Sequence, residues 1–168
     1  MKKNKHPGHK ALRKGRWSQP NRIYLVTTVT NARRPFFNDL FVGRLVVKEM
    51  RRLEYDGIAN SLAWVLMPDH LHWLFGLTEK ENLSQVIKLL KGRSSHKINQ
   101  ILKRSGYVWE KAFHDHALRK EEDIRQTARY VVANPLRAGL VENIYDYPLW
   151  DAIWMEERFQ PRAIVADH

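Results

Sequence analysis

The stretch IANSLAWVLMPDHLHWLFGL, residues 58–77, decides the fold that this sequence predicts. Its first part, residues 58–67, is rich in apolar and strand-forming types, and Pro68 with Asp69 then makes a tight break. Its second part, residues 70–77, alternates as an extended strand does. Four apolar side chains share one face of that strand: Leu71, Trp73, Phe75 and Leu77. The stretch therefore predicts a β-hairpin.

The residues on both sides of this hairpin predict a helix and a further strand in each direction. The expected elements are a strand over 23–30, a helix over 39–55 capped by Asp39, a helix over 82–105, a strand over 115–119 and a helix over 121–133. The order β-α-β-β-α-β-α is typical of the α+β class. It predicts a ferredoxin-like split β-α-β antiparallel sheet with helices packed on one face.

Two of the expected helices contain residues that disfavour helix. Gly92 lies near the middle of residues 82–105, so this helix is expected to bend or break there. Asn134 and Pro135 are expected to end the helix over 121–133, because proline has no N–H and pushes the residue before it out of the right-handed helical region. The residues that follow read as a tail rich in tryptophan.

Positive charge is concentrated at the start of the chain. Ten of the 29 Lys and Arg residues precede Asp39, which is the first acid, whereas residues 39–168 balance nineteen bases against eighteen acids. Such a segment favours a polyanionic partner, with nucleic acid first and a membrane surface second. The plainer alternative is a solubilising tail, although Trp17 and the strand that follows argue against it for the later half of the segment.

Length and composition exclude several classes of protein. The 168 residues predict one domain with a substantial core, and the absence of cysteine excludes disulfide frameworks, cysteine zinc sites and thiol nucleophiles. No apolar run approaches the roughly 18 residues that span a bilayer, and no signal peptide is recognisable. We therefore expect a cytoplasmic protein with no membrane partner.

His70 and His72 carry the sharpest chemical signal. On a strand they project from the same face, where two imidazoles can bind one divalent metal ion. The alternative is a pair of polar side chains on a solvated sheet face. A metal site needs at least one more ligand, and the other histidines look scattered, so a zinc hydrolase with several His and Asp ligands is poorly supported.

Tyr130 and Asn134 are four residues apart and share one face of the expected helix over 121–133. This spacing can bring a phenol and an amide oxygen to one metal ion, and magnesium and manganese prefer oxygen ligands. The alternatives are that Tyr130 is an aromatic residue at the edge of the core and that Asn134 caps a helical turn beginning at Pro135.

With these motifs in order, the chain resembles the REP-associated tyrosine transposases, a branch of the HUH single-tyrosine, single-strand DNA transposases. The motifs are LRKGRWSQPNRIYLVTTVT (12–30), MPDHLHWLFGL (67–77), WEKAFHDHALR (109–119) and RYVVANPLRAGLV (129–141). The resemblance implies Tyr130 as the nucleophile, with His70, His72 and Asn134 as ligands of magnesium or manganese. It also implies single-stranded DNA hairpins from repetitive extragenic palindromes as substrates, a 5′-phosphotyrosine intermediate, and a monomer rather than a homodimer.

Two basic regions are candidates for DNA binding. The first is the basic leader, residues 1–22, and the second is the helix over 82–105, for which the alternative reading is a solvated basic face. Two further arginines lie close in sequence to the helix that carries Tyr130. The residues concerned are Arg13, Lys14, Arg16, Trp17, Arg22, Lys91, Arg93, Lys97, Arg119 and Arg137.

The expected organisation has three parts. Residues 1–22 form a basic DNA-binding leader, residues 23–141 the HUH transposase catalytic domain and residues 142–168 a C-terminal tail. The alternative function is a non-catalytic module of the same fold that binds single-stranded nucleic acid.

Overall fold

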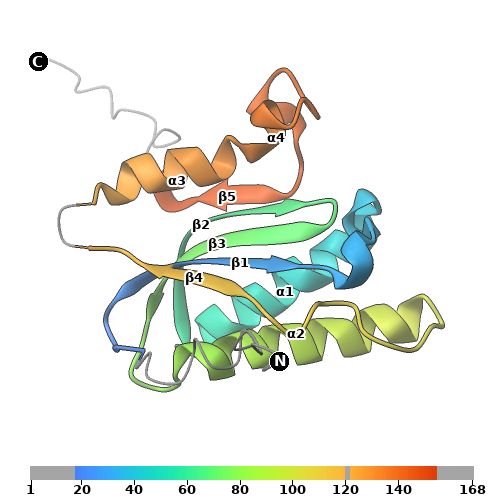
Figure 1. The fold of residues 1–168 in the computed structure, drawn as a ribbon, viewed down its shortest axis with the longest axis horizontal. Coiled ribbons are helices and arrows are strands. Elements are labelled where there is room, and N and C mark those ends of the chain that lie inside the picture. Colours follow the sequence, from blue (N-terminus) through green and yellow to red (C-terminus); the bar gives the residue numbers. More distant parts are fainter. Residues whose placement is uncertain (1–17, 120–121, 155–168) are drawn as a thin grey trace, which may run out of the picture.

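The computed structural model describes residues 18–119 and 122–154. Five strands form one antiparallel sheet in the order β4-β1-β3-β2-β5 (Figure 1). The strands are β1 (Ile23–Val29), β2 (Ala59–Met67), β3 (His70–Leu77), β4 (His114–Ala117) and β5 (Trp150–Ala152). The helices are α1 (Leu40–Tyr55), α2 (Leu83–Ile101), α3 (Ile124–Val132) and the single turn α4 (Asn134–Arg137). Three short 3-10 turns cover Asn31–Arg33, Phe36–Asn38 and Ile144–Asp146.

The predicted hairpin is confirmed. β2 and β3 pair from Met67 opposite His70 at the turn to Ala59 opposite Leu77 at the far end. β1 lies on the other side of β3, and β4 pairs with the free edge of β1. Two split β-α-β units therefore interlock, as the predicted α+β, ferredoxin-like fold requires.

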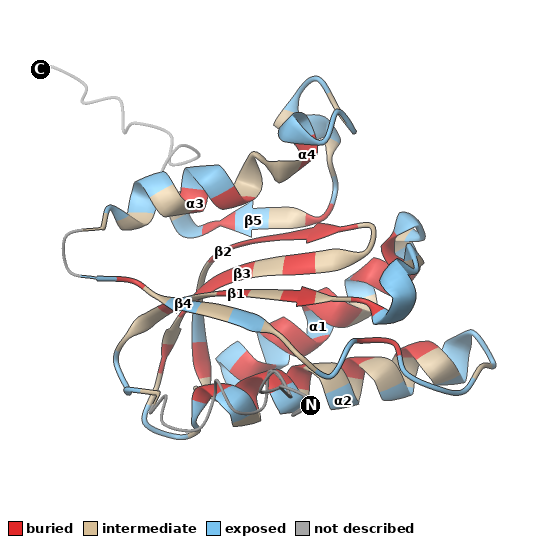
Figure 2. Ribbon diagram, in the orientation of Figure 1, coloured by how far each residue is buried: buried red, intermediate tan, exposed pale blue. Residues whose placement is uncertain are grey.

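The helices lie on both faces of the sheet, whereas the sequence predicted them on one. Trp73 and Phe75 of β3 stack with ring centroids 4.1 Å apart and pack on the side of α1 and α2. α3 covers the opposite face, where Ala128 and Val131 pack on side chains of β2 and β3 (Figures 1 and 2). The physical reason is that Val65 and Leu74 are apolar at positions pointing away from α1 and α2, so this face also needs a cover.

The two expected breaks take other forms. α2 runs without interruption through Gly92 and ends at Ile101, after which Lys103 adopts a positive φ of 49°. Asn134 is not driven out of helical conformation, because the chain makes a turn at Ala133 and starts α4 at Asn134. Pro135 then lies in the first turn of a new helix, where its missing N–H loses no hydrogen bond.

Part of the predicted C-terminal tail belongs to the sheet. β5 extends the sheet at the edge of β2, and Leu149 is buried in the main core. The Tyr147 hydroxyl donates a hydrogen bond of 2.7 Å to the carbonyl of Leu66. Three residues are too few to show a periodic pattern, so this strand was missed. None of the helices in the described ranges is both long enough and apolar enough to span a bilayer.

Candidate functional site

The histidine pair lies on the face of β3 that α3 covers, in the half of the strand next to the β2–β3 turn. The His70 and His72 rings are perpendicular, with their centroids 4.9 Å apart. His72 is directly opposite Thr27 of β1, and its Nδ1 is 2.8 Å from the Thr27 hydroxyl. Strand alternation thus places both imidazoles on one face, as predicted, and the neighbouring strand orients one of them.

His70 is oriented from the hairpin turn. Its Nδ1 is 2.6 Å from a carboxylate oxygen of Asp69, and Arg33 lies 3.5 Å from the other oxygen. Burial alone would raise the pKa of Asp69, but the hydrogen bond and charge of His70, together with Arg33, hold this pKa below its ordinary value. A carboxylate here fixes the imidazole tautomer and leaves Nε2 as the nitrogen available to a ligand.

His72 is neutral at physiological pH. Burial lowers the pKa of His72 to about 4, and the positive charges of His70 and Arg137 act in the same direction. A neutral imidazole retains a lone pair, which a metal ligand requires. Because Nδ1 of each histidine already has a hydrogen-bond partner, the two Nε2 atoms are the nitrogens that the pair can offer to a metal ion.

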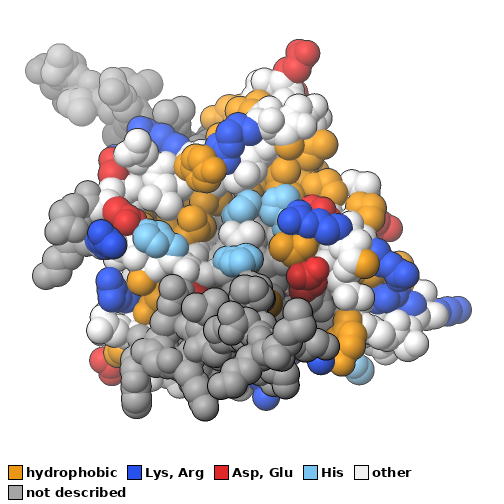
Figure 3. Space-filling view, in the orientation of Figure 1, with side chains coloured by type: hydrophobic (Ala, Val, Ile, Leu, Met, Phe, Trp, Pro, Cys, Tyr) orange, Lys and Arg blue, Asp and Glu red, His pale blue; other side chains and the backbone are white. Residues whose placement is uncertain are grey.

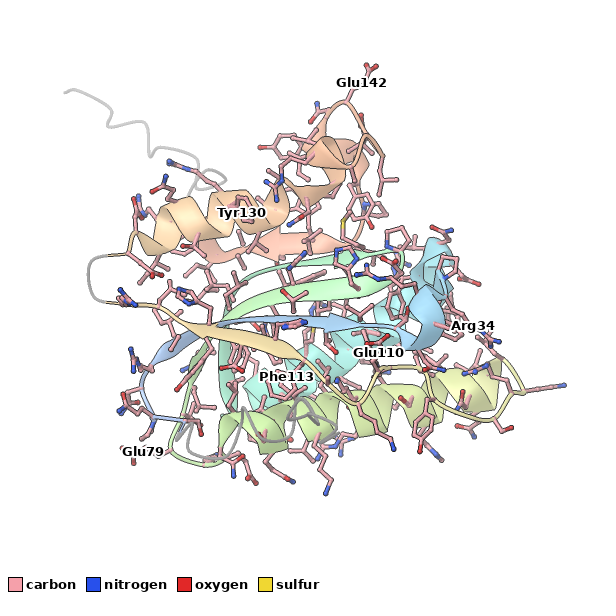
Figure 4. All side chains as sticks on the ribbon, in the orientation of Figure 1. Arg34, Glu79, Glu110, Phe113, Tyr130 and Glu142 are labelled. Atoms are coloured by element: carbon pink, nitrogen blue, oxygen red, sulfur yellow. The ribbon has the colours of Figure 1, made fainter. Side chains whose placement is uncertain are left out.

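α3, which covers the same face of the sheet, presents Tyr130 to solvent (Figure 4). The Asp123 side chain caps the helix by accepting from the backbone N–H groups of Arg125 and Gln126. Ala128 and Val131 anchor the opposite face of the helix, so the Tyr130 side chain remains 61% exposed. An exposed phenol on an anchored helix is accessible to a large substrate, and the alternative of a core-edge aromatic is not what the structure shows.

Arg137 links the tyrosine to the histidines. Its guanidinium lies 3.9 Å from the Tyr130 ring centroid and donates a 2.9 Å hydrogen bond to the Tyr130 carbonyl. Its charge also contributes, after burial and His70, to the lowered pKa of His72. A cation stacked on the phenol and near His72 suits an anionic group bound beside them.

Asn134, the predicted third ligand, turns its amide nitrogen back to the helix. Nδ2 donates 2.8 Å to the carbonyl of Val131. This hydrogen bond assigns the nitrogen and leaves Oδ1 as the amide's acceptor. In the described part of the chain, no three His, Asp or Glu side chains are grouped as metal ligands. Two imidazole nitrogens and an amide oxygen are of the ligand types that divalent cations accept.

Two more histidines share this face, although they look scattered in the sequence. His114 of β4 is opposite Thr27, and His116 is opposite Leu25, so their side chains project on the same side as His72. His116 Nε2 lies 3.0 Å from Oε1 and 2.9 Å from Oε2 of the Glu122 carboxylate. Histidine side chains accordingly gather over the middle of the face drawn in Figure 3. We call His70, His72, His114 and His116 the histidine face. Only the pairing of β4 with β1 reveals it.

The predicted DNA-binding residues are placed differently from one another. Arg13, Lys14, Arg16 and Trp17 lie outside the described residues. Arg119 and Arg137 are exposed near α3, and Arg22 contacts the Gln19 side chain. The three candidates on α2 have intramolecular surroundings: Lys91 donates to the carbonyls of Glu110 and Ala112, Lys97 pairs with buried Glu49, and one Arg93 nitrogen is buried.

The fold and the site together have the features of a tyrosine transposase. Residues 18–134, more than half of the chain, match the family described as "Transposase IS200 like". The chain belongs to this family.

Curated relatives agree with this assignment. The chain is 31% identical over 87 residues to "REP-associated tyrosine transposase" of Escherichia coli (strain K12), with 51% of this chain and 50% of the relative covered. It is 30% identical over 100 residues to "Putative REP-associated tyrosine transposase" of Haemophilus influenzae, with 53% and 56% covered. The resemblance predicted from sequence is confirmed, and the matches span little more than half the length of these relatives.

Solved structures confirm the fold. One is described as "Structure of the REP associates tyrosine transposase bound to a REP hairpin"; it has a TM-score of 0.68 and 22% identity over 80% of this chain and 79% of that one. A putative transposase from Deinococcus radiodurans has a TM-score of 0.50 and 18% identity, covering 80% of this chain and 97% of the other.

Proposed function

We propose that this protein is a transposase that cleaves and rejoins single-stranded DNA hairpins of the repetitive extragenic palindrome type. Membership of the IS200-like family supports cleavage and transfer of DNA strands. The curated relatives are named for REP elements, and the similar solved structure holds a REP hairpin. This substrate is therefore the first to test.

The observation that carries the proposal is the position of Arg137. It stacks on the Tyr130 ring, binds the Tyr130 backbone and lies close enough to affect His72. A nucleophile on α3, a cation on α4 and two metal-capable imidazoles on β3 thus lie on the same side of the sheet. Phosphodiester cleavage needs a nucleophile and positive charge beside the phosphate, and this face offers both.

The chain's own groups account for the chemical step. The Tyr130 Oη attacks phosphorus and loses its proton, the new bond joins the phenol oxygen to the 5′-phosphate, and the bond to the 3′ oxygen breaks. That oxygen takes up a proton and leaves as a 3′-hydroxyl. Attack of a 3′-hydroxyl on the phosphotyrosine reverses these changes. Because the phosphotyrosine bond retains the energy of the broken phosphodiester, rejoining needs no nucleoside triphosphate.

His70, His72 and Asn134 are the residues that would hold a divalent ion, magnesium or manganese. Such an ion supplies Lewis-acid polarisation of the scissile phosphate when bound. Asp69 and Thr27 support this assignment, because each engages one Nδ1 and so orients an Nε2 toward the same face. We propose that the protein acts as a monomer, since one chain contains all of these residues.

The decisive experiment compares wild-type protein with Tyr130→Phe on a palindromic single strand taken from next to the gene. In the presence of Mg²⁺ or Mn²⁺, wild-type protein should give a covalent protein–DNA adduct on a denaturing gel. Tyr130→Phe should give none while binding the hairpin with similar affinity, because Tyr130 is exposed and its hydroxyl is not needed for folding.

Two outcomes would contradict the proposal. An adduct that persists in Tyr130→Phe would assign the nucleophile to another residue. Binding by wild-type protein that is insensitive to chelators and produces no adduct with either metal would favour the alternative, a non-catalytic module that binds single-stranded nucleic acid.

A further inference from the structure

A pocket of about 440 Å³ lies between α2 and residues 106–113. It contains none of the residues of the histidine face, nor Tyr130 or Asn134. Its size is within the range of sites that bind small molecules, whereas a second pocket, beside α3, measures about 160 Å³. The larger pocket therefore needs its own explanation.

Gly92 forms part of the wall that α2 contributes to this pocket. A glycine inside a helix costs roughly 1 kcal/mol relative to alanine. Here neither backbone conformation nor packing demands it, because α2 is regular at this point and a Cβ would have no heavy atom within 4 Å. The space that a side chain at this position would occupy is the pocket itself. Glycine thus keeps the pocket open at a cost to the helix.

Residues 106–113 place aromatic rings beside lysines, one from this segment and one from α2. Lys111 Nζ lies 5.4 Å from the Tyr107 ring centroid, and Lys91 Nζ lies 5.6 Å from that of Phe113. Lys91 also donates 2.7 Å to the Glu110 carbonyl, which fastens this segment to α2. The exposed ring of Tyr107 and the half-buried ring of Phe113, each beside an ammonium group, suit a ligand that is flat, apolar on its faces and attached to negative charge.

The pocket begins where the histidine face ends. Phe113 immediately precedes β4, the edge strand, and Figure 4 shows it between that strand and α2. The next residue, His114, points to the other side of the sheet, opposite Thr27 and in the same cross-strand row as His72. A strand of nucleic acid that crosses the histidine face and passes over the β4 edge would reach the pocket directly.

We propose that this pocket binds an unpaired nucleobase of the single-stranded DNA that the protein processes. The base stacks on Tyr107 or Phe113, and the adjoining phosphates lie near the ammonium groups of Lys88 and Lys111. Three lysines against one glutamate line the pocket, so its charge complements a nucleotide. The inference rests on the proposed function, and it adds a base-binding site away from Tyr130.

The test fills the pocket from its α2 wall. Gly92→Leu projects a side chain into the open space, and Gly92→Ala is the matched control, since one methyl group there meets nothing. Each protein is titrated with a fluorescein-labelled DNA single strand of about ten nucleotides and with an abasic strand of the same length. Gly92→Leu should weaken binding of the normal strand about tenfold and leave the abasic strand unchanged, while Gly92→Ala should match wild-type protein on both.

Equal affinity of Gly92→Leu and Gly92→Ala for the normal strand would overturn the inference, and so would an equal loss on both strands, which would point to phosphate contacts only. Tyr107→Leu provides a second variant, because Tyr107 is 62% exposed and its loss leaves the core intact. It too should weaken only the normal strand. Adduct formation by Tyr130 is measured separately. If wild-type protein forms no adduct, the proposed function is refuted. If it forms an adduct but Gly92→Leu and Tyr107→Leu both bind the normal strand as wild-type protein does, base binding in the pocket is refuted.

Discussion

His70 and His72 show how neighbouring side chains prepare a residue for its role. Asp69 holds one ring and Thr27 holds the other, while burial keeps His72 neutral. Arg137 places a guanidinium charge against the Tyr130 ring on the same side of the sheet. Asp69 directly precedes β3, Thr27 lies on the neighbouring strand β1, and Arg137 belongs to α4. The site is therefore held mainly by regular secondary structure, which keeps its side chains in place.

Tyr147 gives a prediction about alkaline stability. Burial raises the pKa of Tyr147 to about 12, whereas a phenol in an unfolded chain titrates near 10. Between these values the folded state keeps a proton that the unfolded state has lost, so the free energy of unfolding should fall as the pH rises from about 10 to 12. Urea midpoints measured across this range should fall more steeply in wild-type protein than in Tyr147→Phe. Parallel slopes would contradict this assignment.

Among the elements, α1 and α2 are joined by a buried ion pair as well as by apolar contacts. Glu49 of α1 is fully buried and pairs with Lys97 of α2. The lysine that sequence reasoning placed on DNA is therefore engaged in the packing of two helices. An uncompensated charge in a core is costly, which makes this pair a sensitive point of the fold.

Lys97→Met should destabilise the protein by roughly 3 kcal/mol or more, because it leaves the Glu49 carboxylate buried without its partner. The control is the double variant Glu49→Leu with Lys97→Met, which removes both charges and should recover much of the loss. Urea unfolding measures both. A single variant as stable as wild-type protein would contradict this role of the ion pair.

At the scale of the whole molecule, one edge strand of the sheet comes from a segment that the sequence analysis assigned to a C-terminal tail. Leu149 is buried and β5 pairs with β2, so a domain ending at residue 141 lacks the cover of this edge. Tyr147 also bonds to the backbone of β2 at Leu66. The segment 142–154 therefore behaves as part of the folded body.

Shortening the chain after residue 141 should lower the urea midpoint strongly, since it removes the buried side chain of Leu149 together with β5. Leu149→Ala alone should cost about 2–5 kcal/mol. Glu142→Ala is the control on the same segment, because Glu142 is exposed. A shortened chain as stable as wild-type protein would restore the boundary predicted from sequence.

The cationic start of the chain predicts how DNA affinity depends on salt. Removing residues 1–16 takes away seven Lys and Arg residues and no acid. Affinity for the hairpin should fall, and the slope of log affinity against log salt should flatten by about 0.7 for each single-strand phosphate that these residues neutralise. A chain with these seven residues changed to Gln should behave in the same way. Unchanged affinity in both would mean that this segment does not bind DNA.

The hairpin at 58–77, the order of the elements as far as α3 and the motif residues were predictable from the sequence, because strand alternation, caps and turns are local properties. The approximate ends of α1 and β3 followed from Asp39 and from Pro68–Asp69 for the same reason. Gly92 misled because helix propensity is a weak term that neighbouring turns outweigh. A helical turn after α3 was predicted only as an alternative, beginning at Pro135 with Asn134 as its cap; it begins one residue earlier, at Asn134, and tolerates the proline in its first turn.

Local pattern thus sufficed for the α+β class, the histidine pair and the candidate tyrosine. Tertiary structure alone decided that α3 covers the second face, that β5 completes the sheet, that Arg137 joins Tyr130 to His72 and that His114 and His116 share the histidine face. The physical reason is the same in each case. These contacts join residues far apart in the chain or depend on the register between strands, and neither is encoded in the spacing of neighbouring residues.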